Sequence, residues 1–397
     1  MAKLIDITGK ALSGEWGTDD ETGDGIPVLR TTNFTNEGIV NYNDVVTRTI
    51  TKKNIEEKFL RKGDIIIEKS GGSDKFPVGR VIYFDGKDDT YLFNNFTGLL
   101  RVRNQEVWYP RYVFYSLFAN YKRGGTRAFE NKTTGLHNLK TDDYVSRYEI
   151  AETDREKQVL ISEKLDKLYG IIQARKQELQ KLDELIKARF VEMFGDMYLN
   201  TMAWREIHLE TMADIVSGIT KGRKAAGKKL TKVPYMAVSN VKDGYIDWTT
   251  VKTIEATDEE INQYRLLPDD VLMTEGGDPD KLGRGAIIRT PLKNCIHQNH
   301  IFRVRLDESH ILPDYFAQYL KHQRAKRYFL RCAKQTTGIA SINMKQLKAL
   351  PVLLPPLELQ NEFATFVKQV DKSKVAVQKA LDNTQLLFDS LMQQYFG

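Results

Sequence analysis

The chain has 397 residues, of which 41% are hydrophobic and 28% charged, and its formal net charge is +6 at pH 7. This length exceeds one ordinary hydrophobic core, and neither a signal segment nor a membrane-spanning apolar run is visible, so we expect a cytoplasmic globular protein of two domains that binds no membrane. The sequence has only two cysteines, Cys295 and Cys332, and they lack CxxC spacing, so neither a disulfide framework nor a cysteine zinc site is supported.

An internal repeat organises the chain. Its segments pair as follows: 26–38 with 233–244, 62–82 with 268–288, 94–103 with 298–305, and 109–117 with 312–320. The offset falls from 207 at Asn33 and Asn240 to 203 at the two Thr-Thr-Gly turns, residues 133–135 and 336–338. Loop insertions leave such a small drift in a duplicated chain, so we interpret the sequence as two copies of one domain.

Each copy is predicted to contain a sheet followed by a helix. Short β-rich runs occur in both copies: 64–69, 79–84 and 97–102 in the first, and 271–275, 285–290 and 300–305 in the second. Pro110 and Pro313 then open aromatic-rich segments with helical spacing, and proline is well tolerated in the first turn of a helix. Because strands and helices do not alternate regularly, we expect a mixed α+β domain.

A long helix is predicted after each copy. The segment from Thr153 to Phe194 is rich in Lys, Glu, Gln, Leu and Ile and contains no proline, and Thr153 with Glu156 predicts a capping box. Its apolar residues recur at steps of four and three, and the C-terminal segment repeats the pattern at an offset of 202. The predicted interface residues are Ile161, Leu165, Leu168, Ile172, Leu179, Leu182 and Ile186 in the first helix, and Phe363, Val367, Val370, Val377, Leu381, Phe388 and Leu391 in the second.

Such stripes need a partner, because burying each apolar side chain stabilises by about 1.5–3 kcal/mol. We therefore expect the two helices to form an antiparallel coiled coil of roughly 60 Å about a pseudo-twofold axis. The predicted boundaries are 1–152 and 198–355 for the repeated domains, and 153–197 and 356–397 for the helices. Pairing with a second chain in a dimer is the alternative.

Two similar domains on a rigid spacer suggest a long partner, and duplex DNA fits this description. One turn of duplex spans about 34–36 Å, so contacts on one face recur at that spacing. Basic residues cluster at matching places, 122–132 and 321–334, where phosphate contacts are their natural use. The alternative for each cluster is a solvated helix face.

Candidate contact residues are cations for phosphates and side chains with paired donors and acceptors for bases. In the first copy they are Asn33, Lys69, Ser73, Lys75, Arg80, Asn95, Arg127, Lys132, Thr134 and His137. In the second they are Asn240, Lys281, Arg284, Gln298, Asn299, Arg331, Lys334, Thr337, Ser341 and Asn343. Asn and Ser in turns also bond their own backbone, which is the alternative for each. Because HNLK follows one Thr-Thr-Gly turn and ASIN the other, different half-sites are expected.

Signals of catalysis are weak in this sequence. The Gly-Gly turns do not continue into Gly-Lys-Ser or Gly-Lys-Thr, which argues against a phosphate loop. His297 and His300 have no third ligand nearby, and no dinucleotide-binding turn is visible. We therefore predict no catalytic residue, no metal and no cofactor on this chain.

The two Thr-Thr-Gly segments, PPLELQ at 355–360, the two heptad helices and the strands before Gly-Gly together resemble the specificity subunit of type I restriction-modification systems. The resemblance covers essentially the full length. It implies a non-catalytic subunit with two target recognition domains, each reading half of a bipartite DNA sequence, and an antiparallel two-helix spacer. It also implies partners: methyltransferase subunits that bind S-adenosylmethionine, and a motor-nuclease subunit, with ATP and Mg²⁺ on these partners. By itself the chain is expected to be monomeric.

Two departures from the family pattern stand out. ETDREKQ at 152–158 replaces PPLELQ in the first copy and keeps only Gln158 opposite Gln360. Asp6-Ile7 match Asp214-Ile215, which leaves the segment from Trp204 without a counterpart in the first copy. Two other readings stay open, namely an interaction scaffold whose domains do not bind DNA and an enzyme that acts alone.

Overall fold

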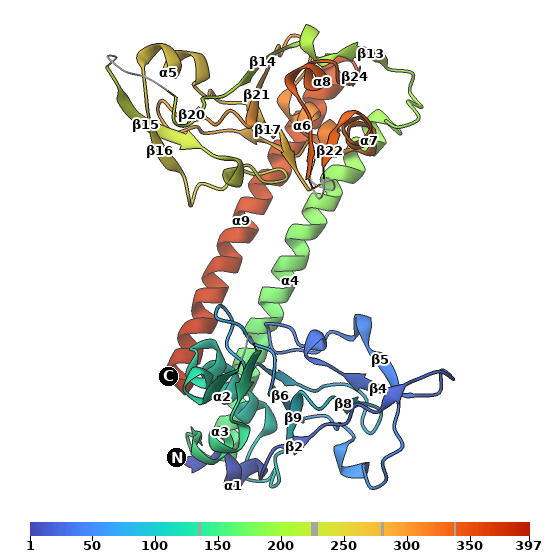
Figure 1. Ribbon diagram of the computed structural model, residues 1–397, viewed down its shortest axis with the longest axis vertical. Helices are drawn as coiled ribbons and strands as arrows, with labels where there is room; N and C mark the ends of the chain where they lie inside the picture. Colours follow the sequence, from blue (N-terminus) through green and yellow to red (C-terminus); the bar gives the residue numbers. More distant parts are fainter. Residues whose placement is uncertain (134–135, 224–228, 279–281, 337–338) are drawn as a thin grey trace. The chain divides into compact units, whose positions relative to one another are not determined.

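The computed structural model describes residues 1–133, 136–223, 229–278, 282–336 and 339–397. The chain forms two compact units. Unit 1 consists of residues 1–176 and 379–397, and unit 2 consists of residues 177–378. Each unit holds β-strands, short helices and part of each of two long helices (Figure 1). The units therefore divide both long helices, whereas the boundaries predicted from sequence treat each helix as a segment of its own.

Unit 1 contains two four-stranded sheets. The first has the order β2 (Leu12–Ser13), β9 (Thr97–Leu100), β6 (Ile65–Glu68) and β7 (Val81–Tyr83), all antiparallel. The second has the order β3 (Thr18–Asp19), β5 (Val46–Thr49), β4 (Ile26–Leu29) and β8 (Leu92–Phe93), in which β4 and β8 are parallel. Strand β6 is buried on both faces, because Ile65 and Ile67 join one hydrophobic core and Ile66 joins another. This explains its uninterrupted apolar run.

Unit 2 repeats this arrangement. Its four-stranded sheet has the order β14 (Ala213–Ser217), β21 (Ile301–Leu306), β17 (Asp270–Thr274) and β19 (Gly285–Ile288). Its second sheet has the order β16 (Lys252–Ala256), β15 (Thr231–Met236) and β20 (Ile296–His297), again with one parallel pair, β15 with β20. The register is also repeated, since Leu12 pairs with Leu99 and Val216 pairs with Arg303. The predicted duplication and the mixed helix and strand content are confirmed.

The two helices that were predicted to begin at a proline do begin there. α2 (Pro110–Lys122) and α6 (Pro313–Lys321) both carry proline in the first turn. The other helices outside the long pair are α1 (Leu4–Thr8), α3 (Thr141–Arg147), α5 (Asp258–Tyr264), α7 (Gln323–Cys332) and α8 (Met344–Lys348). The remaining strands are β1 (Ala2–Lys3), β10 (Glu130–Thr133), β11 (Leu136–Leu139), β12 (Glu149–Ile150), β13 (Arg205–His208), β18 (Gly276–Gly277), β22 (Lys334–Thr336), β23 (Ile339–Ser341) and β24 (Pro351–Leu354). Among the described residues, no helix is both long and apolar enough to cross a membrane.

The amino-terminal segment corrects one alignment. β1 pairs with β12 in unit 1, as β13 pairs with β24 in unit 2, so the first copy contains a short form of the segment that seemed to lack a counterpart. The match of Asp6-Ile7 to Asp214-Ile215 is wrong. Gly14 is the true equivalent of Gly218, because both glycines lie against a backbone carbonyl of a neighbouring strand. A Cβ atom on Gly14 would overlap the carbonyl of Phe93, and one on Gly218 would overlap that of His297.

A buried ion pair also recurs in the two units. Arg101 donates to Asp64 from Nη2 at 2.7 Å, and Arg305 donates to Asp270 from Nε at 2.8 Å. Both carboxylates are almost fully buried, with exposed fractions of 2% and 1%. Each carboxylate also accepts a backbone N–H from three residues earlier in the chain. The predicted match of Asp64 with Asp270 is therefore confirmed, and both residues close the turn before the central strand.

Each long helix is tied to its domain by one buried glutamine. In unit 1, Gln158 Oε1 accepts the N–H of Tyr109 at 2.8 Å, and its Nε2 donates to the carbonyls of Val107 and Thr153. In unit 2, Gln360 makes the same three bonds to Leu312, His310 and Pro355. The match that the sequence offered between Gln158 and Gln360 therefore reflects a shared clamp at the start of each helix.

Replacing Gln158 by alanine should lower the free energy of unfolding of unit 1 by about 2 kcal/mol or more, because three backbone groups would lose their partner in a buried site. Chemical denaturation measures the change. Gln180 offers the control, since it is exposed on the same helix and its side chain donates to Glu184 at the surface. Gln180→Ala should stay within about 0.5 kcal/mol of the parent chain. Equal effects of the two substitutions would contradict the clamp.

The long helices α4 (Arg155–Phe194) and α9 (Leu357–Phe396) are 40 residues each. In unit 1, Ile161, Leu165 and Ile172 of α4 share a hydrophobic core with Phe388 of α9, and Leu168, Leu381 and Leu391 pack against it. In unit 2, Ile186 of α4 shares a core with Phe363, Val367 and Val370 of α9, with Leu182 packed against it. Leu179 is half-buried and Val377 is buried. The predicted capping box is wrong, because Asp154 caps α4 by accepting the N–H of Lys157 at 2.7 Å.

Candidate nucleic-acid interface

Thr133 and Thr336, the first residues of the two Thr-Thr-Gly motifs, end strands β10 and β22, and we name the two hairpins that contain these strands the Thr-Thr-Gly hairpins. β10 pairs with β11 in unit 1, and β22 pairs with β23 in unit 2. In both units the Gly-Gly segment after the central strand lies beside this hairpin: Gly71 donates its N–H to the carbonyl of His137 at 3.1 Å, and β18 pairs with β23. The candidates Thr134, Lys281 and Thr337 lie outside the described residues, as does the side chain of Lys132.

The loop at 70–78 in unit 1 is held firmly by the hairpin. Glu130, from β10, accepts the N–H of Val78 at 2.9 Å with Oε1, while its Oε2 lies 3.2 Å from Nδ1 of His137. The other ring nitrogen of His137 lies 3.7 Å from the carboxylate of Asp74, and Arg127 donates to the carbonyl of Asp74 at 3.2 Å. His137 is therefore buried among loop contacts, which gives it the role of positioning the loop.

Two adjoining hollows of about 460 and 390 Å³ flank this loop in unit 1. They share Asn36, Phe76, Pro77 and Tyr121. The first hollow is further lined by Thr31, Thr32, Phe34, Glu68, Gly71, Gly72, Ser73 and Arg80, and the second by Lys75, Lys122, Arg123, Gly124 and Arg127. Four cations from the loop, the end of α2 and the residues after it thus gather in the second hollow. Together the two hollows form what we call the unit 1 groove.

Two candidates are engaged inside the domain: Arg80, which lines the groove, and Lys69, which lines neither of its hollows. Arg80 donates to the carbonyls of Phe34 and Thr31 and to Glu68. Burial raises the pKa of Glu68, while Arg80 opposes that shift. Lys69 donates to the hydroxyl of Ser13 at 2.9 Å, and its partial burial lowers its pKa.

Asn33 and Asn240 have equivalent structural roles. Their exposed fractions are 1% and 0%. Asn33 accepts the N–H of Arg30 at 2.8 Å and donates to the carbonyl of Asn41, and Asn240 bonds Ala237 and Asp247 in the same way. The prediction of base contacts for these two residues is not supported, because their amides are buried and spent on the backbone of their own turn.

The other polar candidates are distributed over both units. Asn95 is exposed in the turn before β9. In unit 2, Asn343 caps α8 by accepting the N–H of Gln346 at 2.9 Å, and Ser341 pairs with Gly276 in the hairpin sheet. Gln298 and Asn299 lie in the turn before β21, where the carbonyl of Asn299 accepts from the hydroxyl of Ser217.

Unit 2 has a smaller basic hollow at the equivalent loop. Its volume is about 250 Å³, and its lining includes Arg284, Lys321 and Lys326 together with Asp243. Arg331 and Lys334 are exposed, at the end of α7 and the start of β22. The two units therefore share the position of the basic surface but differ in its shape and charge.

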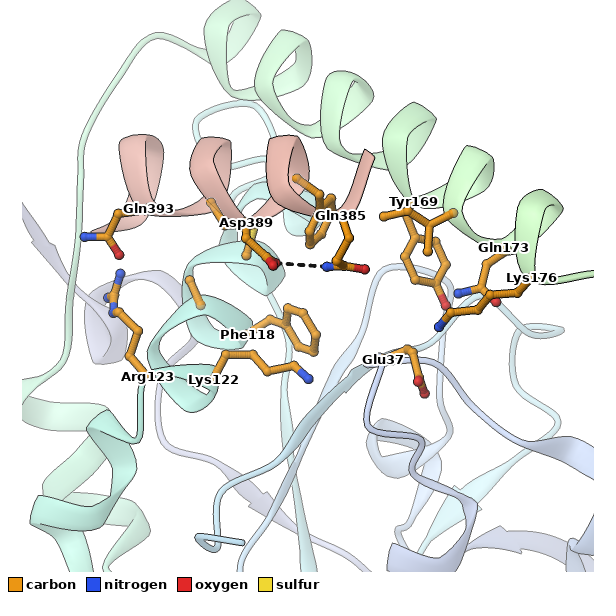
Figure 2. Close-up of a pocket in the computed structure, with 14 residues that line it drawn as sticks. Glu37, Phe118, Lys122, Arg123, Tyr169, Gln173, Lys176, Gln385, Asp389 and Gln393 are labelled. Carbon is orange, nitrogen blue, oxygen red and sulfur yellow. Dashed lines mark hydrogen bonds between the residues drawn. The ribbon is translucent and has the colours of Figure 1, made fainter. Parts of the chain in front are cut away.

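A further hollow of about 550 Å³ lies in unit 1 between α2 and the adjacent parts of α4 and α9 (Figure 2). Phe118 projects into it from α2, and Tyr169 and Gln173 from α4 (Figure 2). Across it, Gln385 donates to Asp389 at 3.0 Å along α9. It shares Lys122 and Arg123 with the unit 1 groove, but its lining also includes the carboxylates Glu37 and Asp389, so its charges are mixed. Unit 2 has a hollow of about 380 Å³ in the corresponding place.

His297 and His300, which were considered as a possible metal site, lie in different environments. His297 is fully buried, its Nδ1 lies 3.1 Å from the carbonyl of Ile301, and burial lowers its pKa to about 4. His300 is exposed and lies 2.6 Å from Glu275. Within the part of the chain that the structure describes, no cluster of three His, Cys, Asp or Glu residues could hold a metal ion.

Comparison with known proteins identifies the repeated domain. A family model described as the type I restriction modification DNA specificity domain matches residues 2–184 and again residues 203–385. The chain belongs to this family. It carries two DNA specificity domains in tandem, as a specificity subunit of a type I restriction-modification system does, and this is a non-catalytic role. The scaffold reading is not supported.

The similar proteins are also specificity subunits, and one of them is a solved structure with a similar fold. The chain is 23% identical over 393 residues to the EcoKI specificity subunit of Escherichia coli strain K12, covering 93% of this chain and 80% of the relative. It is 24% identical over 386 residues to the StySPI specificity subunit of Salmonella potsdam, with the same coverage. The solved S subunit from M. genitalium matches with a TM-score of 0.57 at 16% identity, covering 100% of this chain and 95% of that chain. Specificity subunits of these systems act on DNA together with methylase and restriction subunits.

Sequence reasoning missed Phe76, Asn36 and Tyr121 in the unit 1 groove. Phe76 is 52% exposed, whereas Tyr121 is almost buried. An isolated aromatic residue in a sequence is more often part of a core than of a surface. The available signal was its context, a phenylalanine between lysine and proline in a glycine-rich loop.

Proposed function

We propose that each unit reads one half of a bipartite duplex DNA target. The observation that carries this proposal is the unit 1 groove, a cationic hollow beside a loop fixed by the Thr-Thr-Gly hairpin, with a differently shaped basic hollow at the equivalent loop of unit 2. Cations at the rim suit phosphates, and the loop residues between them suit base edges. Different loops on a repeated scaffold favour different half-sites.

We further propose that α4 and α9 form an antiparallel coiled coil with pseudo-twofold symmetry. This proposal is supported by the partners of each helix part: the first part of α4 shares a core with the end of α9 in unit 1, and the end of α4 shares a core with the start of α9 in unit 2. A continuous pair of helices would fix the distance between the two reading domains, and so the gap between the half-sites.

The outer faces of these helices are the proposed docking surface for methyltransferase subunits. Exposed apolar side chains on the helices are Leu160, Ile171, Leu386 and Leu387 in unit 1, and Leu185, Val191 and Val375 in unit 2. In this proposal S-adenosylmethionine, ATP and Mg²⁺ are bound by the methyltransferase and motor-nuclease partners and none by this chain. A monomeric state of the free chain and a cytoplasmic location stay predictions.

The test combines the purified chain with duplex DNA and labelled S-adenosylmethionine, with and without its methyltransferase subunit. We expect methyl transfer only when both proteins are present, and only at sites that share one bipartite sequence. Transfer by this chain alone would contradict the non-catalytic role. Transfer by the methyltransferase that is equally fast without this chain, or that ignores sequence, would contradict the role in specificity. Mapping the methylated bases identifies the target.

A further inference from the structure

One exposed aromatic residue divides the unit 1 groove. Phe76 lines both hollows, and 52% of its surface is exposed. Single exposed apolar residues are common on protein surfaces, so exposure alone says little. The position of Phe76 is what distinguishes it, because its ring is a ridge between two hollows whose other linings are largely polar or cationic.

The backbone holds this ring outward. The carbonyl of Phe76 accepts the N–H of Ser73 at 2.6 Å, and its N–H donates to the Ser73 hydroxyl at 3.1 Å. Two residues further on, the N–H of Val78 is bonded to the buried carboxylate of Glu130. The backbone at Phe76 is therefore held by hydrogen bonds within its own turn and, two residues further on, by a bond to β10.

The loop that carries Phe76 has a shorter counterpart in unit 2. The offset between the copies is 206 at β6 and β17 but 204 at β7 and β19, so the loop of unit 2 is two residues shorter. At the offset of 204, Val78 corresponds to Leu282, and both are buried in the core of their unit, with exposed fractions of 0% and 4%. Val78 is therefore the inward apolar side chain of this loop, and Phe76 lies before it, in the part of the loop whose length differs between the units.

The surroundings of the ring indicate what it contacts. The Lys75 ammonium lies 5.4 Å from the ring centroid, and Lys122, Arg123 and Arg127 line the hollow on that side. A partner that matches this surface carries anions outside and an apolar group between them. In the major groove of duplex DNA, phosphates flank the base edges, and the thymine C5 methyl is the apolar group presented there.

We propose that Phe76 contacts the C5 methyl group of a thymine in the half-site that unit 1 reads. This inference rests on the proposed function and deepens it, since it assigns one base preference to one residue. It predicts that the unit 1 half-site contains a thymine whose methyl group contributes to affinity.

The experiment uses the full chain assembled with its methyltransferase subunits and replaces the thymines of the mapped target by uracil one at a time, which removes only the C5 methyl. For the parent complex, one replacement in the unit 1 half-site should weaken binding about fourfold, the amount expected for one buried methyl group. Phe76→Ala should weaken binding to the thymine target about tenfold and abolish the sensitivity to uracil at that position. Phe76→Leu, which keeps an apolar side chain, should retain part of that sensitivity.

Lys122→Gln is the matched control, because this exposed cation lines the same hollow. It should weaken target and scrambled DNA alike, reduce the salt dependence by about one ion, and keep the uracil sensitivity. If every single uracil replacement is neutral for the parent complex, or if Phe76→Ala keeps the sensitivity, the Phe76 inference is wrong while the preference for target over scrambled DNA stands. A parent complex without that preference would overturn the proposed function as well.

Discussion

Inserting one heptad into each long helix should move the binding optimum to targets with a wider gap between the half-sites and weaken binding to the original target about 100-fold or more. Seven helical residues add about 10 Å, which corresponds to about three base pairs of duplex. With the original gap, only one domain could then stay in register, and each mismatched base pair costs about 1–3 kcal/mol. Loss of contacts at a whole half-site is therefore a large effect.

The insertion points follow from the two units. Placing one heptad after Lys176 in α4 and the other after Gln378 in α9 leaves each unit with its own residues, because these positions are the boundaries between the units. Binding is measured on duplexes whose gap grows by one base pair at a time. Inserting the same heptad after Gly23, an exposed position with open space around it, should leave the optimum unchanged.

The same series tests the geometry of the proposed coiled coil. Three extra base pairs turn the second half-site by about 100° around the duplex axis, since one turn holds about 10–10.5 pairs. A rigid spacer of the new length would therefore meet the second half-site on a rotated face. An optimum that moves by more than three pairs would indicate that rotation matters as well as length. An optimum that does not move would refute a helical spacer as the ruler.

The repeat made much of the fold predictable from one sequence. The offset between copies fell only from 207 at Asn33 to 202 at Gln158, so strands, helix starts and the glutamine clamp could be aligned without a homologue. The alignment failed at the amino terminus, where β1 and β12 are strands of only two residues. A strand of two residues is too short to show an alternating pattern in the sequence. The alignment therefore followed the similarity of Asp6-Ile7 to Asp214-Ile215 and missed the match of Gly14 to Gly218.

The candidate site was predictable by region and less so by residue. The Gly-Gly loop and the Thr-Thr-Gly hairpin do lie together, which places Ser73, Lys75 and Arg127 around one groove. Residue roles depended on burial. Asn33 in a turn and an asparagine aimed at a base have the same sequence signature, and only the hydrogen bonds to Arg30 and Asn41 separate the two cases. Phe76 escaped notice because the sequence does not distinguish an exposed phenylalanine in a loop from a buried one.

Different side chains pack the two long helices against the rest of the protein in the two units. In unit 2, Phe190 and Phe194 of α4 meet Phe363 of α9 and Tyr315 of α6, with ring centroids 5.0–5.6 Å apart. These rings are at most 1% exposed. The residue of unit 1 that corresponds to Phe363 is Ile161, at an offset of 202. The aromatic cluster of unit 2 is therefore where both long helices and the recognition domain are packed together.

Phe363→Ala should lower the free energy of unfolding of unit 2 by about 3–5 kcal/mol, because it leaves a cavity beside the rings of Phe190 and Phe194. Since a chain of two units need not unfold in one step, hydrogen exchange measured along the chain should locate the loss. We expect reduced protection in α6, the end of α4 and the start of α9, with unit 1 close to the parent protein. Val375→Ala is the control on the same helix, because Val375 is 70% exposed, and it should change stability by less than about 0.5 kcal/mol.

DNA binding by the Phe363→Ala protein shows whether the aromatic cluster orients the unit 2 domain. Phe363 is fully buried, so its substitution can affect DNA binding only indirectly, through the stability of unit 2 or the orientation of its domain on the helices. Binding to a duplex with only the unit 1 half-site should then match the parent protein, while the added affinity from the second half-site falls. If the affinity for both half-sites falls equally, the two units are coupled more tightly than their separate hydrophobic cores imply. If neither weakens, the aromatic cluster stabilises unit 2 without orienting it, and the spacer must position the domain through the Gln360 clamp alone.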